Sequence, residues 1–148
     1  MHFNVSTCYG MQIILYLTRN KKIVSSTELS GSLHISKRYI IQIAGKLRDG
    51  CLIETHAGMS GGYTLGKEAS AISVYDIFSL FEGDICIPQC VNQCNNDSIH
   101  TALSTLKEYL DVYLKVLTLD QLADMDTYGR LSEVIRIAET QMVAIKNS

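Results

Sequence analysis

Residues 36–50 read SKRYIIQIAGKLRDG, a helix signal with its own start and stop. Ser36 is a typical N-cap residue, and Gly50 is typical of the residue that follows a helix. Between them apolar residues recur at steps of three and four, which predicts a helix from Lys37 to Asp49 with one buried side. The positions expected on that side are Ile40, Ile43, Ala44 and Leu47.

The segments on either side of this helix complete a recognisable order. Upstream, residues 7–19 and 27–33 are predicted to form helices. Downstream, residues 51–56 alternate as a strand does, with Cys51 expected in the core, and a glycine-rich turn leads to a second strand at residues 63–65. A helix, a helix–turn–helix and a β-hairpin in this order predict a winged helix–turn–helix, a mainly α fold with a small β-hairpin wing.

The second half of the chain is predicted to be helical. A helix over residues 73–82 precedes a cluster of cysteines, and a long helix follows over residues 98–117, with an apolar stripe at spacings near 3–4–3–4 that is typical of a dimerisation helix. A further helix is expected over residues 127–146. We therefore expect a winged helix–turn–helix DNA-binding domain over 1–83, a cysteine sensor loop over 84–97 and a helical dimerisation region over 98–148.

Composition and charge agree with this division. The chain has 148 residues, of which 47% are hydrophobic and 19% are charged, so it is expected to be globular. Its net charge is −2, but residues 1–83 carry eight basic against six acidic side chains and residues 84–148 five against nine. A polyanion is therefore expected on the first half. No apolar run is long enough to span a bilayer and no signal peptide is evident, so we expect a cytoplasmic protein without membrane contact.

The polar side of the helix over residues 37–49 is the candidate DNA-reading surface. Arg38 can read guanine and Gln42 can read adenine, while Lys37 and Lys46 are expected on phosphates. In the hairpin turn, glycines allow close approach to a groove. Alternatively, these charges are only solvated and the glycines only make a tight turn. The expected DNA contacts are Lys37, Arg38, Tyr39, Gln42, Lys46, Gly61 and Gly62.

Three cysteines lie within nine residues, at Cys86, Cys90 and Cys94. A straight helix would place the first and last ~12 Å apart, and Pro88 opposes a helix at the start of the loop. The segment must curl for the thiolates to converge on an iron–sulfur cluster or a zinc ion. A thiol–disulfide switch without metal is the alternative, although the acidic flanks disfavour thiolates.

The motifs agree in order and spacing with one known family. The chain resembles the IscR/NsrR/CymR-type (Rrf-type) regulators over essentially its whole length. The resemblance implies a winged helix–turn–helix homodimer that binds palindromic operators on double-stranded DNA, with the long helix as the dimer element and, in many members, an iron–sulfur cluster in the loop. The strings that carry the resemblance are Ile35–Gln42, Leu47–Gly50, Gly58–Leu65, Ile72–Asp76 and Phe81–Gly83.

The resemblance also suggests a fourth ligand for the three loop cysteines. Cys8 stands where another branch has an acid contributed across the dimer; from the residues alone it would be a small packed side chain. His100 is the alternative, because in some members a histidine begins the equivalent helix. Two positions depart from the family pattern: Ala57 replaces an arginine before the wing glycines, and Ile41 replaces an acid.

No motif of an enzyme is present. The chain has no phosphate-binding glycine loop, nucleophile elbow or His-Glu-x-x-His. We therefore predict that it is not an enzyme but a dimeric transcriptional regulator, more specifically a repressor, switched by an iron–sulfur cluster or another metal or redox state. The alternatives are a regulator of the same fold controlled by thiols or by a partner protein, with zinc or no cofactor, and a protein-interaction module that does not bind DNA.

Overall fold

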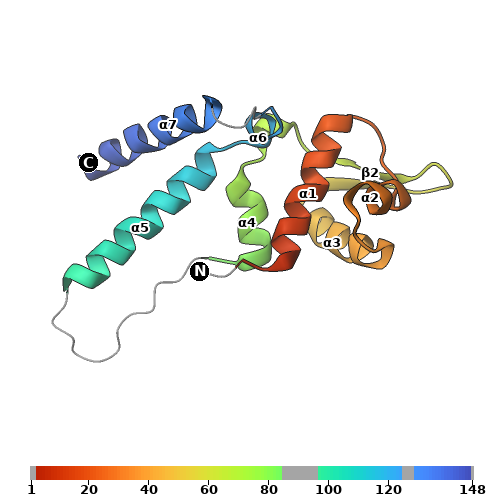
Figure 1. Cartoon of the computed structure of the whole chain (residues 1–148), viewed down its shortest axis with the longest axis horizontal. Helices are drawn as coiled ribbons and strands as arrows, with labels where there is room; N and C mark the ends of the chain where they lie inside the picture. Colours follow the sequence, from red (N-terminus) through yellow and green to blue (C-terminus); the bar gives the residue numbers. More distant parts are fainter. Residues whose placement is uncertain (1–2, 85–96, 125–128, 148) are drawn as a thin grey trace.

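The computed structural model describes residues 3–84, 97–124 and 129–147. Three helices and a hairpin form one end of the molecule, and two longer helices form an arm that extends from it (Figure 1). The elements are α1 (Val5–Asn20), α2 (Ser26–Leu33), α3 (Lys37–Asp49), β1 (Ile53–His56), β2 (Gly62–Leu65), η1 (Ala69–Ala71), α4 (Val74–Glu82), α5 (Asp97–Val116), α6 (Leu119–Ala123) and α7 (Gly129–Lys146).

The helix that the sequence defines most sharply is confirmed. Helix α3 spans Lys37–Asp49, the hydroxyl of Ser36 accepts from the backbone N–H of Tyr39 at 3.4 Å, and Gly50 is the C-cap. The four positions expected to be buried are buried. They join apolar side chains from α1, α2, β1 and α4 in one core, whose fully buried members include Ile13, Ile14, Leu29, Ile40, Ile43, Leu47, Ile53 and Ile77.

The first strand begins later than the alternation predicts. Cys51 has a φ of 57°, in the left-handed region, and its side chain is exposed. The N–H of Leu52 returns to the carbonyl of Leu47 at 2.9 Å, so the chain is still closing α3 at this point. The strand starts only at Ile53, and the expectation that Cys51 opens it and lies in the core was wrong.

The hairpin is attached to the helices through its second strand. Strands β1 and β2 are antiparallel, with Ile53 opposite Leu65 and His56 opposite Gly62. The backbones of Val24 and Tyr63 exchange two hydrogen bonds, at 2.9 and 3.0 Å, so the segment before α2 pairs with β2. This pairing fixes the hairpin beside α2 and α3, in the position of a wing. We use "wing" for residues 53–65.

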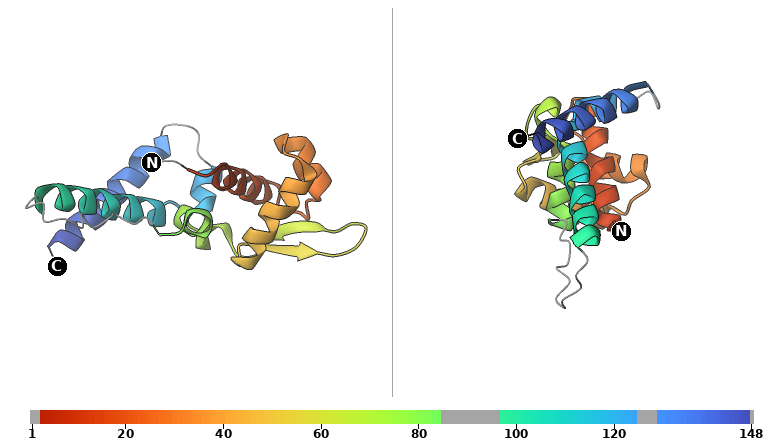
Figure 2. Two further views of the ribbon diagram at one scale, coloured as in Figure 1. Left: turned by 90° about the horizontal axis from the view of Figure 1, so that it is seen from below. Right: turned by 90° about the vertical axis from the view of Figure 1, so that its left-hand side faces the viewer.

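A second junction holds the arm to this end of the molecule. Ser73 and Asp76 form a capping box at the start of α4. The backbone N–H of Val74 donates to Leu117 O at 2.8 Å, and that of Leu119 donates to Ile72 O at 2.8 Å. Helix α6 therefore sits against η1 and α1, and α5 leads away from α4 to pack against α7 (Figure 2). No helix in the described ranges is long and apolar enough to cross a membrane.

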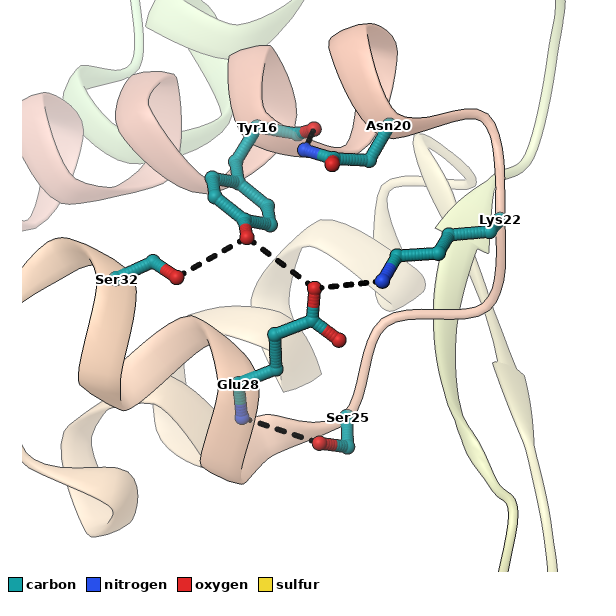
Figure 3. Close-up of polar contacts among 6 residues, drawn as sticks. All are labelled: Tyr16, Asn20, Lys22, Ser25, Glu28 and Ser32. Atoms are coloured by element: carbon teal, nitrogen blue, oxygen red, sulfur yellow. Dashed lines mark hydrogen bonds and ion pairs between the residues drawn. The ribbon is translucent and has the colours of Figure 1, made fainter.

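A polar cluster sets the turn between α1 and α2 (Figure 3). The carboxylate of Glu28 accepts from Lys22 at 2.9 Å and from the hydroxyl of Tyr16 at 3.2 Å, and that hydroxyl also lies 3.0 Å from Ser32 Oγ. Ser25 caps α2 by accepting from the Glu28 N–H at 3.1 Å. The hydrogen bond from Lys22 holds the pKa of Glu28 below its ordinary value of 4.5.

Candidate nucleic-acid interface

Helix α3 presents a defined outer face. With four positions committed to the core, the side directly opposite carries residues at i, i+3, i+4 and i+7. Arg38, Ile41 and Gln42 are exposed there, and Gly45 is half-buried. In the helix–turn–helix this is the side that can enter the major groove. Two of the expected base-reading residues are therefore exposed on one face, with an apolar side chain beside them; their contact with DNA stays a prediction.

Lys37, the first residue of α3, lies beside the wing. It borders a shallow notch of about 310 Å³ that is also lined by the start of α2 and by His56, Gly58 and Met59 of the wing. The N–H groups of a helix N-terminus and a lysine are groups that bind a phosphate. The expectation that Lys37 contacts DNA backbone fits this position. Met59 at the wing tip is fully exposed.

Tyr39, another of the expected DNA contacts, is engaged within the chain. Its hydroxyl lies 2.8 Å from Ser6 Oγ, and its ring meets the ring of Tyr9 edge-on at a centroid distance of 5.5 Å. Both partners belong to α1. These contacts hold the side chain on the flank of α3 that faces α1, where it helps to orient the helix; the contact of Tyr39 with DNA stays a prediction.

Lys46 lies on that same flank. Its ammonium is 5.6 Å from the centroid of the Phe81 ring, at the end of α4. The same ring covers Gly10 of α1, where an added Cβ would lie 2.6 Å from Phe81 Cε2. Lys46 therefore links α3 to the element that leads into the cysteine loop. Sequence reasoning included Phe81 in a family string but did not foresee these contacts with Lys46 and Gly10.

Close backbone contacts explain why glycine stands at both wing positions, Gly61 and Gly62. A Cβ on Gly61 would lie 2.3 Å from His56 O, and a Cβ on Gly62 would lie 2.3 Å from Val24 O. Both positions are closed to any larger residue by backbone oxygens. The tight-hairpin alternative thus accounts for Gly61 and Gly62 without DNA, and their contact with DNA stays a prediction.

The three loop cysteines, Cys86, Cys90 and Cys94, lie outside the described residues. Of the candidate fourth ligands, Cys8 is exposed on α1 and His100 is exposed in the first turns of α5. Exposure removes the alternative that Cys8 is only a packed side chain. Within the described ranges no three His, Cys, Asp or Glu side chains gather in a way that could hold a metal ion. Thiolates are suitable donors for an iron–sulfur cluster or zinc, and a site formed by the loop cysteines stays a prediction.

Glu82 ties the end of α4 to the first turn of α1. Its carboxylate accepts from the backbone N–H of Asn4 at 2.6 Å and from the hydroxyl of Thr7. Thr7 is the neighbour of Cys8, and Glu82 lies four residues before Cys86 in the chain. The segment that leads into the cysteine loop and the turn that carries Cys8 are thus held together by hydrogen bonds.

Helix α5 carries exposed apolar side chains along one face. Ile99, Leu103 and Leu106, at i, i+4 and i+7, are 54%, 44% and 65% exposed. On α7, Val143 and Ile145 are 58% and 51% exposed. Exposed apolar side chains along one helix face are typical of an interaction surface.

Comparison with known proteins settles the family. Residues 3–125 match the Rrf2 family, described as iron-dependent transcriptional regulators. The chain belongs to the Rrf2 family. It is 30% identical over 146 residues to the transcriptional regulator IscR of Klebsiella pneumoniae, covering 90% of each protein, and 32% identical over 79 residues to CymR of Bacillus subtilis. In the matches with B. subtilis CymR and a Lactococcus lactis regulator, the chain spans only 57% and 47% of the relative's length.

Solved Rrf2 structures share the fold. That of B. subtilis CymR, described as the global cysteine regulator of that organism, superposes with a TM-score of 0.75 at 25% identity, over 83% of this chain and 96% of CymR. Staphylococcus aureus CymR gives a TM-score of 0.71 at 26% identity, over 84% and 100%. The mainly α fold with a two-stranded wing is therefore confirmed. The family is one of transcriptional regulators, and IscR is named as such a regulator rather than as an enzyme.

Proposed function

We propose that the chain is a homodimeric repressor that binds a palindromic operator with affinity set by a sulfur-held centre at Cys86, Cys90, Cys94 and Cys8. The observation that carries the DNA-binding part is the exposed pair Arg38 and Gln42 on α3, beside Lys37 and the wing, in a chain of the Rrf2 family. Arginine and glutamine at this place on a recognition helix can pair with guanine and adenine in the major groove.

The exposed face of α5 supports the dimer. A two-fold axis between two copies of α5 would bring Ile99, Leu103 and Leu106 of each chain against their counterparts and remove them from water. Operator binding would require the same axis to place the two α3 helices on one side of the assembly. Two recognition helices related by two-fold symmetry require an operator with two inverted half-sites, about one helical turn apart.

The contacts around Glu82 support a route from the loop to α3. A centre bound by the loop thiolates would supply redox-dependent and iron-dependent chemistry. Two sets of contacts would transmit a change at this centre to the DNA-binding part: Glu82 is hydrogen-bonded to the first turn of α1, and Phe81 is packed between Gly10 and Lys46. A change in the position of the last turn of α4 would therefore shift α1 and the recognition helix together.

The first test concerns the sulfur centre. The full chain is purified without oxygen, and its absorbance spectrum and its iron, sulfide and zinc contents are measured. Cys8→Ala is expected to lose or destabilise the centre, whereas the matched variant Cys51→Ala, which removes the other exposed thiol of the described residues, is expected to keep it. Full loading of Cys8→Ala would overturn the role of Cys8; loss of the centre in His100→Ala would then assign that ligand to His100.

The second test concerns DNA. Affinity for duplex DNA is measured from about 50 to 200 mM salt, and a binder that contacts several phosphates on each strand should lose about a thousandfold or more. Arg38→Ala is expected to lower the preference for operator over random duplex by 1–3 kcal/mol per half-site. A duplex affinity that does not change with salt, together with an unchanged operator preference in Arg38→Ala, would favour the protein-interaction alternative.

A thiol switch without a cluster is the second candidate, favoured by one comparison. An oxidised form of S. aureus CymR has been solved, and this chain matches it with a TM-score of 0.71 at 25% identity. In this chain two loop cysteines would form the disulfide, each losing one hydrogen to an oxidant. Oxidation of the metal-free protein would then lower its mass by two hydrogens and change operator affinity; a colourless protein with neither effect would exclude this candidate and the cluster together.

A further inference from the structure

Two features of the outer face of α3 have no explanation within the described part of the chain. Ile41 is an isoleucine with 51% of its surface exposed, in the middle of a helix that otherwise keeps its isoleucines buried. Gly45, one turn further on, would have no atom within 4 Å of an added Cβ. Glycine in a helix interior lowers stability relative to alanine, and here no neighbouring group forbids alanine.

The two residues lie side by side. Positions i and i+4 are neighbours on a helix surface, so Ile41 and Gly45 form one low apolar spot. Arg38 and Gln42 lie along the same outer face, and Lys37 beside the wing marks its edge. A cost in helix stability together with an unburied isoleucine is expected where a partner comes close from outside the chain.

The major groove offers one apolar group on the base edges, the 5-methyl group of thymine. We propose that Ile41 is a specificity-determining residue that packs on a thymine methyl in each half-site, and that Gly45 allows α3 to approach the groove closely enough for this contact. The inference rests on the proposed DNA-binding function and extends it, because it assigns a thymine to the operator and an apolar reader to the helix.

One experiment distinguishes a failure of this inference from a failure of the proposed DNA-binding function. The full chain, purified without oxygen, selects duplexes from a random-sequence pool, and each thymine of the enriched sequence is then replaced by deoxyuridine, which keeps the base pair and removes only the methyl group. The wild type is expected to lose about fourfold in affinity at one thymine of each half-site, the effect of one buried carbon group. Ile41→Ala is expected to bind more weakly and to be indifferent to that replacement. Ile23→Ala, which trims an isoleucine that is 45% exposed in the segment before α2, is expected to behave as the wild type.

Two glycine variants test the close approach. Gly45→Ala and Gly31→Ala both add a methyl group in a helix where no atom lies within 4 Å, so both are expected to fold at least as stably as the wild type. Only Gly45→Ala is expected to weaken operator binding, by about tenfold or more, with random duplex bound as before. Equal sensitivity to deoxyuridine in the wild type and Ile41→Ala, or no sensitive thymine, would overturn the inference while leaving DNA binding in place. A pool from which no sequence is enriched would overturn the proposed function, and the inference with it.

Discussion

The ammonium group of Lys46 lies over the ring of Phe81, 5.6 Å from its centroid. Lys46 belongs to the recognition helix and Phe81 to the last turn of α4, five residues before Cys86. A cation over an aromatic ring contributes about 0.5–1 kcal/mol at an exposed site. The contact is therefore weak enough to be exchanged for a phosphate, and it joins the part of the chain that reads DNA to the part that leads into the cysteines.

Gly10→Ala is expected to disturb this contact. The new Cβ would lie 2.6 Å from Phe81 Cε2, so the ring must move away from α1. Overpacking of this kind costs about 1–3 kcal/mol, which outweighs the gain of replacing a helical glycine. Urea unfolding at fixed protein concentration measures the loss. Adding Phe81→Leu should restore part of it; a Gly10→Ala protein as stable as Gly31→Ala would show that the ring does not constrain α1.

Leu106→Asp is expected to separate the proposed dimer. Leu106 is 65% exposed in the single chain, and a two-fold axis would bury the Leu106 of both chains. In the variant, each dimer would lose two apolar contacts and gain two buried charges. The dissociation constant should rise about a hundredfold or more. Analytical ultracentrifugation measures it, with Glu108→Ala, at an exposed position two residues along α5, as the control. Unchanged association in Leu106→Asp would place the dimer contact elsewhere.

Ser73→Ala is expected to weaken the junction between the winged unit and the arm. The Ser73 hydroxyl accepts from the Asp76 N–H at 3.1 Å, and the Asp76 carboxylate accepts from the Ser73 N–H at 2.8 Å. Loss of such a cap costs about 1 kcal/mol, which lowers Tm by about 2–4 °C in a chain of this size. Thermal unfolding followed by circular dichroism measures the change. Ser70→Ala, at an exposed site in η1, should leave Tm unchanged; an equal drop in both variants would deny the cap its role.

The Glu28 cluster predicts a specific loss of stability in acid. The pKa of Glu28 is held below 4.5 by the hydrogen bond from Lys22, so its ionised form stabilises the folded chain above the pKa of the unfolded chain. That contribution disappears as the pH falls through the lower pKa of the folded state. The urea midpoint of Glu28→Gln should therefore fall less than that of the wild type between about pH 6 and about pH 3. Because the ion pair is exposed, added salt should reduce the difference. Glu54→Gln, at an exposed site on β1, should retain the wild-type pH dependence.

The sequence by itself determined the local elements and the family. The cap Ser36, the apolar spacing to Leu47 and the stop at Gly50 define α3 to the residue, because these signals act within a few residues of one another. The motif order was sufficient to indicate the Rrf2 family and the wing. Only the tertiary structure decided which side chains of α3 also contact other helices. The spacing of apolar residues predicts that Tyr39 and Lys46 lie on the surface of α3. In the structure, residues of α1 and α4, which are distant in the sequence, contact both side chains. Cys51 is a second example, because the alternation of apolar and polar residues does not reveal that the backbone at Cys51 is still turning out of α3. Contacts between residues far apart in sequence depend on how whole elements pack, and no local pattern encodes that packing.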